Sequence, residues 1–258
     1  MLVVLSPAKR LNEKPVDVCE RLQCTTPVFA DRATVLLDVL KKFDARELQS
    51  LMGISDKLAQ LNYERFQQMK IPANGQGKPA VFLFNGEAFQ GLAAHTLTDV
   101  ELQRLQQHLR ILSGLYGVLR PLDIIMPYRL EMGTSLQFDG YADLYAFWKD
   151  TLTDFINSEI EKANFTALIN LASQEYFNAL DPEKIRVPIY HIHFREYHNG
   201  RYKFMAFYGK KARGLMTRFI VKNNLQTPEE LVHFDLEGYH FHPEMSDTYN
   251  LYFTRGDE

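Results

Sequence analysis

The stretch from Thr98 to Gly133 constrains the fold most, because it combines a helix start signal with a long apolar face. Thr98 and Glu101 have the spacing of a capping box, in which each side chain bonds to a free backbone N–H at the helix start. Apolar residues then recur every three or four positions, as on one face of a helix: Leu102, Leu105, Leu109, Leu112, Tyr116 and Leu119. This pattern predicts a central helix that continues to Leu119 and ends before Pro121.

The second half of this predicted helix carries no charge between Ile111 and Leu119, which favours burial on most sides. Gly114 and Gly117 each cost a helix about 1 kcal/mol relative to alanine, so we interpret them as points of close backbone approach. Beyond the helix we expect one rim that presents polar side chains: Arg120, Asp123, Tyr128, Arg129 and Glu131.

Composition is that of a globular protein. With 258 residues, 46% hydrophobic and 24% charged, the chain can bury a sizeable core, and we expect one domain over residues 1–258. No apolar run approaches about 20 residues, so we expect no membrane-spanning segment. The start, MLVVLSPAK, lacks the features of a signal peptide, and we expect a cytoplasmic protein. Cys19 and Cys24 form neither a CxxC nor a metal-binding pattern, which fits a reducing compartment.

One segment concentrates positive charge, although the formal net charge of the chain is −3. Between Tyr197 and Pro228 there is no acidic residue, while seven lysines and arginines occur: Arg201, Lys203, Lys210, Lys211, Arg213, Arg218 and Lys222. Such segregation focuses a positive field on one region. A local site for a polyanion and a solvated helix face with acidic neighbours both remain open.

Continuous apolar runs predict three buried strands, at residues 1–5, 80–84 and 166–171. Residues 187–194 and 202–207 predict a hairpin that turns at Asn199-Gly200. Helical patterns occur at 29–42, at 141–162 and from the turn at Gly209–Arg213 to Asn223. Closing strands are predicted at 239–242 and 249–254. This alternation predicts a mixed α/β fold, with a central mixed β-sheet and surrounding helices.

Four of the predicted strands end in polar or basic turns, at Ser6, Asn85, Asn170 and Gly209. Ligands of sheets with helical crossovers bind outside the carboxyl ends of strands, so we expect one cleft there. Its expected lining is Lys9, Glu87, Ser173, Glu175, Lys210, Lys211 and Arg213. The turn from Gly209 to Arg213 also predicts a helix N-terminus that favours an anion. Ordinary loop chemistry is the alternative at each turn.

Acid–base chemistry is possible in this cleft, because a carboxylate beside a lysine can exchange protons when burial shifts the two pKa values. The catalytic candidates are Lys9, Glu87, Glu175 and Lys211. The sequence contains no GxxxxGK, GxSxG or GxGxxG motif, so no reaction is named and no cofactor is expected.

Residues 44–69 predict two helices joined by the tight turn Leu51-Met52-Gly53-Ile54-Ser55. The pattern resembles a helix-hairpin-helix element, in which Gly53 permits a positive φ and the N–H groups from Ser55 to Lys57 bind a phosphate. Met52 and Ser55 stand where this element usually has proline and glycine, so a plain packing corner between two helices remains an alternative.

Two H-x-H pairs are weak candidates for a transition-metal site: His191 with His193, and His240 with His242. Residues at i and i+2 of a strand share one face, and four imidazoles suit a divalent transition metal. No acidic residue joins them at a suitable spacing, so we interpret them as structural histidines.

Several strings stand together in one order: Ser6-Pro7-Ala8-Lys9, Leu58-Ala59, the run from Leu112 to Asp123, the run from Pro127 to Gly133, Asn170-Leu171-Ala172-Ser173 and Lys210-Lys211-Ala212-Arg213-Gly214. In that order they resemble the YaaA family of peroxide-stress proteins, and the resemblance covers essentially the whole chain. The chain departs from the family pattern at Arg10 and at Glu87-Ala88-Phe89, where aspartate, valine and tyrosine are expected.

The resemblance implies a cytoplasmic protein of the hydrogen-peroxide response that limits damage by lowering unincorporated iron. It also implies a mixed α/β fold, a basic cleft, a helix-hairpin-helix element and affinity for duplex DNA. Carried over residue by residue, the hairpin falls on Gly53, Ser55 and Lys57. The basic cleft falls on Lys9, Arg129, Lys210, Lys211 and Arg213, and Arg218 of the basic segment is a further candidate contact for phosphate.

Two main hypotheses follow. In the first, the protein binds duplex DNA through phosphate contacts that are largely independent of sequence. In the second, which is the alternative to this preferred interpretation, it is an enzyme that acts on a phosphorylated or nucleotide-like small molecule at the strand ends.

Overall fold

The computed structural model describes residues 1–73 and 76–256, which form a mixed α/β fold. Eight strands of the described residues make one sheet in the order β4-β3-β1-β6-β7-β10-β9, with β8 paired to β7. They are β1 (Leu2–Leu5), β3 (Leu109–Ser113), β4 (Gly117–Leu119), β6 (Leu168–Leu171), β7 (Ile189–Tyr197), β8 (Tyr202–Lys203), β9 (His240–Phe241) and β10 (Asn250–Arg255). The five strands β3, β1, β6, β7 and β10 are parallel, and β4, β8 and β9 pair antiparallel. The predicted mixed sheet is confirmed.

A second, small antiparallel pair joins β2 (Lys78–Pro79) to β5 (Ile124–Ile125). The α-helices are α1 (Ala30–Leu40), α2 (Ala45–Met52), α3 (Asp56–Gln68), α4 (Ala80–Leu83), α5 (Glu87–Leu92), α6 (Asp99–His108), α7 (Leu144–Ala163), α8 (Gln174–Phe177) and α9 (Ala206–Asn223). The 3-10 helices are η1 (Val18–Glu20), η2 (Ala94–Thr96), η3 (Pro182–Lys184), η4 (Pro228–His233), η5 (Leu236–Gly238) and η6 (Pro243–Met245).

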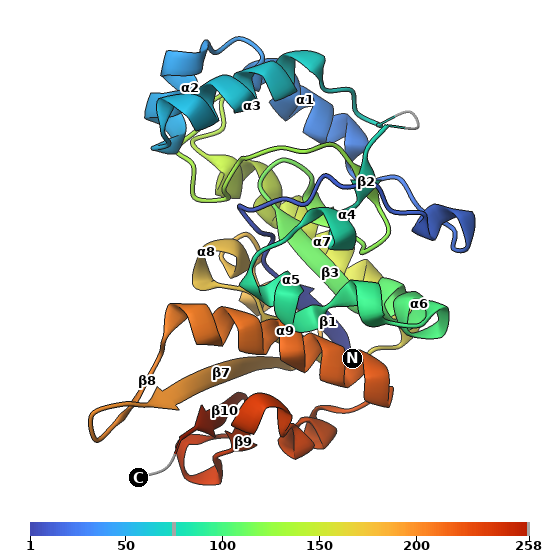
Figure 1. Ribbon diagram of the computed structural model, residues 1–258, viewed down its shortest axis with the longest axis vertical. Helices are drawn as coiled ribbons and strands as arrows, with labels where there is room; N and C mark the ends of the chain where they lie inside the picture. Colours follow the sequence, from blue (N-terminus) through green and yellow to red (C-terminus); the bar gives the residue numbers. More distant parts are fainter. Residues whose placement is uncertain (74–75, 257–258) are drawn as a thin grey trace.

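The sheet extends from the middle of an elongated molecule, at β3 and β1, to one end, at β7, β10 and β9 (Figure 1). Helices α1 to α3 occupy one end of the long axis, while β7, β9 and β10 occupy the other, with α9 along β7 (Figure 1). All four residues of β1 are buried, because this strand is flanked on both sides by the parallel strands β3 and β6. The carboxyl end of β1 therefore emerges at the centre of the molecule.

The predicted helix from Thr98 to Leu119 is wrong in its second half. The Thr98–Glu101 capping box forms as expected, but α6 ends at His108, and the chain continues as the β3–β4 hairpin. The run from Ile111 to Leu119 carries no charge, so it fits a central strand as well as a helix, and the pairing of β3 with β1 decides the outcome. Gly117 lies in this hairpin at φ +71°, where a Cβ atom would be 2.6 Å from the Trp148 ring.

The close backbone approach expected at Gly114 is confirmed. A Cβ atom there would lie 2.4 Å from the carbonyl oxygen of Leu130. The indole N–H of Trp148 also donates to the Gly114 carbonyl oxygen at 2.9 Å. The glycine thus packs the β3–β4 turn directly against the segment that leads to Glu131.

The predicted strand at residues 80–84 is also wrong, because these residues form the short helix α4. The N–H of Ala80 donates to the carbonyl oxygen of Asp123, and the N–H of Val81 donates to that of Pro121. Residues 80–84 therefore do not pair with a neighbouring strand of the main sheet. In the same way, β8 stops at Lys203 and α9 already begins at Ala206. The expected strand end at Gly209 therefore lies inside a helix. The N-terminus of this helix, at Ala206, precedes Lys210, Lys211 and Arg213.

Other local predictions are confirmed. The β7–β8 hairpin turns at Asn199 and Gly200, which both have positive φ, at 51° and 75°. Helices α1, α7, α2 and α3 and strands β1, β6, β9 and β10 lie where the sequence predicts them, within a few residues. Over residues 1–73 and 76–256, no helix combines the length and apolar character needed to cross a membrane.

Candidate anion-binding pocket

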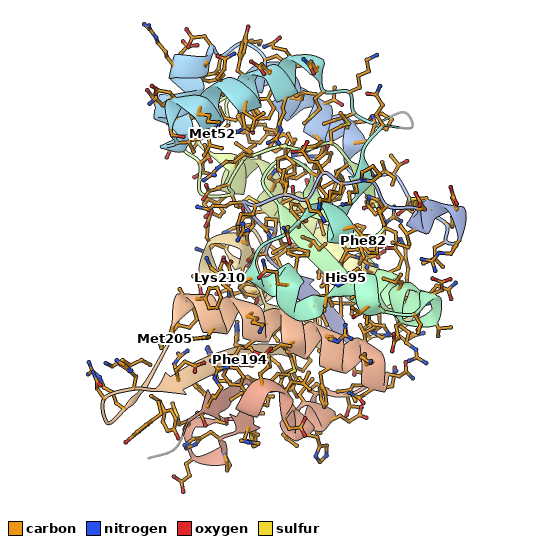
Figure 2. The ribbon with its side chains drawn as sticks, in the orientation of Figure 1. Met52, Phe82, His95, Phe194, Met205 and Lys210 are labelled. Carbon is orange, nitrogen blue, oxygen red and sulfur yellow. A yellow bond between two sulfur atoms is a disulfide. The ribbon has the colours of Figure 1, made fainter. Side chains whose placement is uncertain are left out.

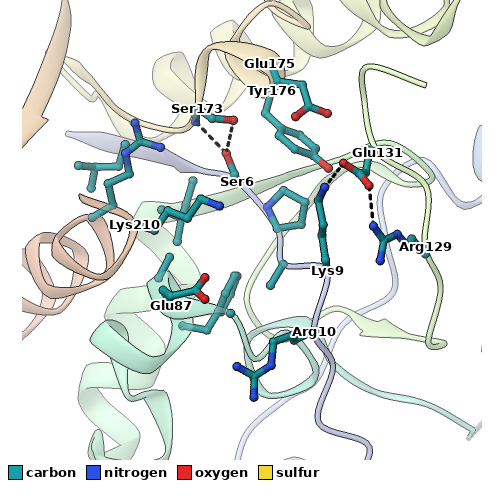
Figure 3. Close-up of a pocket in the computed structure, with 18 of the residues that line it drawn as sticks. Ser6, Lys9, Arg10, Glu87, Arg129, Glu131, Ser173, Glu175, Tyr176 and Lys210 are labelled. Carbon is teal, nitrogen blue, oxygen red and sulfur yellow. Dashed lines mark hydrogen bonds and ion pairs between the residues drawn. The ribbon is translucent and has the colours of Figure 1, made fainter. Parts of the chain in front are cut away.

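A pocket of about 440 Å³ lies at the carboxyl ends of β1 and β6 (Figure 3). Five chain segments line it. They are the turn after β1, the start of α5, the segment from Tyr128 to Glu131, the turn after β6 with α8, and the first half of α9. Sheets with helical crossovers bind ligands at this edge, so the location alone marks a candidate site.

The pocket brings together most of the predicted cleft residues and, from the predicted rim, Glu131: Lys9, Glu87, Arg129, Glu131, Ser173, Glu175, Lys210 and Arg213. They come from distant parts of the sequence and meet because β1 and β6 are adjacent and parallel. Their roles in binding or catalysis stay predictions.

One carboxylate in the pocket neutralises two cations. The ammonium of Lys9 lies 2.5 Å from Oε2 of Glu131, and the Arg129 guanidinium donates to Oε1 at 3.0 Å (Figure 3). The Nε–H of Arg129 is buried and has no hydrogen-bond partner. Glu131 therefore fixes both cations at one wall, while Arg129 keeps an unused donor.

Three other cations of the pocket have no carboxylate within 4.0 Å among the described residues: Arg10, Lys210 and Arg213. Burial lowers the pKa of the Arg213 guanidinium, and the positive charge of Arg195 lowers it further. A group that loses hydration without gaining a counter-ion is stabilised by an incoming anion. Arg213 is such a group, and the exposed ammonium of Lys210 adds a second positive charge without a carboxylate partner among the described residues.

Hydroxyl groups hold the two strand ends together. The N–H of Ser173 donates to Oγ of Ser6 at 2.8 Å, and this hydroxyl donates to Oγ of Ser173 at 3.2 Å. Ser6 follows β1 and Ser173 follows β6, so the contact fixes the floor of the pocket (Figure 3). Sequence reasoning used Ser6 only as a strand end and missed this role.

Two carboxylates, Glu87 and Glu175, are outside the ion pairs of the described residues. Glu87 lies in the first turn of α5 and points into the pocket (Figure 3). Glu175 accepts a hydrogen bond from the N–H of Gly133 at 3.1 Å, and its backbone carbonyl accepts one from the Tyr145 hydroxyl. Both remain available for proton transfer or for hydroxyl groups of a ligand.

Two tyrosines at the pocket act as neutral groups. Burial raises the pKa of Tyr128 and of Tyr176 well above the ordinary value for a phenol. The Tyr128 hydroxyl shares a 2.5 Å hydrogen bond with Oγ of Ser113. Sequence reasoning missed Tyr176, although its position directly after Glu175 is a usable signal.

Several predicted residues lie elsewhere. Lys211 does not line the pocket, and its ammonium lies 2.6 Å from Glu237. The Arg218 guanidinium donates to the carbonyl oxygens of Leu92 and Ala93 at the end of α5. Arg120 and Asp123 pair with each other at 3.0 Å and not with the rim. These side chains therefore stabilise the fold around the pocket.

The predicted turn between two helices is confirmed for α2 and α3. Asp44 caps α2 through a capping box. Gly53 ends this helix at φ 59° and ψ 43°, a left-handed backbone conformation that favours glycine. Ser55 precedes α3 without a side-chain hydrogen bond to its N–H groups, and Lys57 is exposed. The assignment as a helix-hairpin-helix element stays a prediction.

The four candidate histidines are not assembled into one site. Strand β10 lies between β7, which holds His191 and His193, and β9, which begins at His240. His191 is paired with Asn170, and His193 is bonded to Asn250 and stacked on Tyr252. Over the described residues no three His, Cys, Asp or Glu side chains are grouped as for a metal ion.

Cys19 and Cys24 form a disulfide bond, which the expectation of reduced cysteines did not anticipate. The five-residue separation matches no motif, so only the folded loop brings the two sulfur atoms together. The bond lies outside the pocket.

Comparison with known proteins agrees with the resemblance seen in the sequence. A family model described as "Peroxide stress protein YaaA" matches residues 1–245. The chain is similar to the UPF0246 proteins of Hahella chejuensis, at 47% identity, of Teredinibacter turnerae, at 44%, and of Saccharophagus degradans, at 43%. Each comparison covers 99% of both chains. The chain therefore belongs to the YaaA family of peroxide stress proteins.

Proposed function

We propose that the protein serves the peroxide-stress response by binding a phosphate-bearing ligand in the pocket at the ends of β1 and β6. The observation that carries this proposal is the position of Lys210 and Arg213, which face the pocket without a carboxylate partner among the described residues. Arg10 adds a third such cation. A dianionic phosphate compensates these charges, and the guanidinium of Arg213 matches two of its oxygens.

The other groups of the pocket suit a ligand with hydroxyl or amine groups next to its phosphate. Glu87 and Glu175 accept hydrogen bonds or protons, and the neutral phenol of Tyr176 donates one. We propose the cytoplasm as the compartment. An enzyme that transforms a phosphorylated or nucleotide-like small molecule fits this set, with Lys9 and Glu87 as the first candidates for proton transfer.

Adjacent lysines supply a matched test. Lys210 lines the pocket, whereas Lys211 pairs with Glu237 outside it. We expect inorganic pyrophosphate to bind the wild type in isothermal titration calorimetry, and Lys210→Met or Arg213→Met to weaken binding about tenfold or more, a loss of about 1.4 kcal/mol. Lys211→Met is expected to change the affinity by less than about twofold. Equal effects of Lys210→Met and Lys211→Met, or no binding by the folded wild type, would contradict the proposal.

Duplex DNA is the second candidate ligand, because a DNA backbone presents the same phosphate chemistry. The observation that favours it is the exposed turn between α2 and α3, where Lys57 lies at the start of α3. In the view of Figure 2, Met52 in this turn and Lys210 both lie toward the left of the molecule. A duplex that contacts both regions would receive positive charge from each.

Fluorescence anisotropy of a labelled duplex distinguishes the two ligand sources. If DNA is bound by both regions, Lys57→Ala and Lys210→Met each weaken duplex binding, binding falls steeply with salt, and Lys57→Ala leaves pyrophosphate affinity unchanged. The control is Lys149→Ala, an exposed lysine of α7. Pyrophosphate binding without duplex binding would leave the small-molecule function and remove the DNA function.

We also propose that the protein lowers unincorporated iron during peroxide stress, as the family resemblance implies. The test is the level of unincorporated iron, measured by electron paramagnetic resonance in peroxide-treated cells with and without the gene. Complementation by wild type but not by Arg213→Met would connect this role to the pocket. Equal iron levels with and without the gene would contradict the role.

A further inference from the structure

The disulfide between Cys19 and Cys24 closes a short loop whose residues do not line the pocket described above. These are the only two cysteines of the chain, and their Cα atoms are 5.4 Å apart. Cys19 lies in η1 and is exposed, whereas Cys24 is half-buried and packs against the core. The pair therefore has one sulfur that solvent reaches easily and one that is partly shielded.

The loop does not need the disulfide to hold its place. Val18 and Leu22 are buried within the core on either side of Cys19. Just after Cys24, Thr25 exchanges two backbone hydrogen bonds with the segment at Leu122 and Ile124, at 2.9 and 2.8 Å.

Side-chain contacts hold the same segment. The Thr25 hydroxyl donates to the buried carboxylate of Asp123 at 2.6 Å, and Arg21 pairs with Asp99 at the same distance. A disulfide that closes so short a loop also removes less unfolded-chain entropy than one that closes a long loop. These contacts hold the loop without the disulfide, so the disulfide is not needed as a permanent structural cross-link.

We propose that Cys19 and Cys24 form a reversible dithiol–disulfide pair that is oxidised by hydrogen peroxide. Two observations carry this assignment: the two sulfur atoms are already within bonding reach in a loop that is anchored independently, and Cys19 is open to solvent. Oxidation by a small diffusible peroxide requires an accessible thiolate with a second thiol next to it.

The reaction balances in two steps. The Cys19 thiolate attacks one oxygen of hydrogen peroxide, the O–O bond breaks, Cys19 becomes a sulfenic acid, and the released hydroxide takes up a proton to form water. The Cys24 thiol then attacks the sulfenic sulfur, the S–O bond breaks, and the disulfide forms with release of a second water molecule. A cellular dithiol returns two electrons and two protons by thiol–disulfide exchange at the exposed sulfur.

Intact mass and thiol alkylation test the pair in the full-length protein. We expect dithiothreitol to reduce the native protein without denaturant, so that two alkylating groups are added. One equivalent of peroxide is then expected to remove both reactive thiols and to lower the mass by two hydrogen atoms. The rate is expected to exceed that of glutathione, measured in the same buffer, about tenfold or more. Hydrogen exchange is expected to be faster in the loop of the reduced form, but unchanged at the Thr25 amide.

Single variants identify the order of attack. In Cys24→Ser, peroxide is expected to leave a sulfenic acid at Cys19 that dimedone traps, whereas Cys19→Ser is expected to react about tenfold more slowly. The variant with both cysteines changed to serine is expected to keep the wild-type circular dichroism spectrum. A native bond that resists dithiothreitol until the protein is denatured would show a structural cross-link and overturn the proposal. Oxidation no faster than that of glutathione would overturn it as well. Neither result depends on ligand binding in the pocket.

Discussion

The ammonium of Lys9, in the turn after β1, lies 2.5 Å from Oε2 of Glu131 at the wall of the pocket. The second oxygen of Glu131 is bound by Arg129 at 3.0 Å. One carboxylate thus neutralises two of the five cations that line the pocket, and Arg10, Lys210 and Arg213 determine its remaining charge. This division gives opposite expectations for substitutions on the two sides of the pocket.

Glu131→Gln is expected to strengthen the binding of pyrophosphate by about three- to tenfold, because Lys9 and Arg129 then contribute uncompensated charge. The melting temperature is expected to fall, since a half-buried guanidinium loses its partner. Calorimetric titration at low salt measures the affinity, with Asp154→Asn, an exposed carboxylate of α7, as the control. Weaker binding by a folded Glu131→Gln protein would show that the carboxylate positions the cations instead of neutralising them.

Asp123→Asn is expected to lower the free energy of unfolding by about 1–3 kcal/mol, because it weakens the hydrogen bonds of a fully buried side chain whose partner Arg120 is partly exposed. Asp123 is fully buried and accepts hydrogen bonds from the Arg120 guanidinium, the Arg120 N–H and the Thr25 hydroxyl. Urea denaturation measures the change. Asp99→Asn breaks the exposed pair with Arg21 and is expected to cost less than about 1 kcal/mol. Similar losses for both variants would contradict the difference in burial.

His193 is expected to make the protein less stable in mild acid. Burial lowers the pKa of its imidazole, and the positive charges of Arg195 and Arg213 lower it further. The folded state therefore favours the neutral ring. Its contribution to stability is complete above the ordinary histidine pKa of about 6.5 and is lost as the pH falls below that value.

The matched substitution for this effect is His193→Phe, which keeps a ring stacked on Tyr252. The loss of unfolding free energy between about pH 7.5 and pH 5.5 is expected to be smaller in this variant than in the wild type, as measured by urea denaturation at each pH. His95→Gln changes an exposed histidine and is expected to leave the slope unaltered. A slope equal to that of the wild type in His193→Phe would rule out the imidazole as its source.

Gly214→Ala is expected to destabilise the protein by about 1–3 kcal/mol, although alanine favours helices. The added Cβ atom would lie 1.7 Å from the carbonyl oxygen of Ala88, so helix α5 must move. Gly209→Ala places its Cβ atom 2.4 Å from the exposed ring of Phe204, which can rotate away, and is expected to cost less than Gly214→Ala. Thermal denaturation compares the two, and an equal or smaller cost at Gly214 would disprove close α5–α9 packing. Because Gly214 directly follows Arg213 in α9, a shift of this helix is also expected to weaken pyrophosphate binding in Gly214→Ala.

Local signals in the sequence predicted several parts of the fold. Capping residues at Thr98 and Asp44, the Asn199-Gly200 turn and the apolar runs of β1 and β6 act through neighbouring residues, so they are readable without the structure. The same runs placed Lys9, Ser173 and Glu175 at strand ends, and the pocket contains all three. The site was visible to this extent because parallel strands end on the same edge of their sheet.

The sequence by itself determined the mixed α/β class, the caps and turns, and the family, which depend on short-range patterns and on residue identity. Tertiary structure alone decided that residues 109–119 form a hairpin, that residues 80–84 form a helix, and that Cys19 reaches Cys24. It also decided that Lys210 faces the pocket while Lys211 faces Glu237. The physical reason is that a largely apolar run is compatible with both a helix and a strand. The surroundings of a helical side chain, in turn, are set only when its helix packs against the rest of the fold.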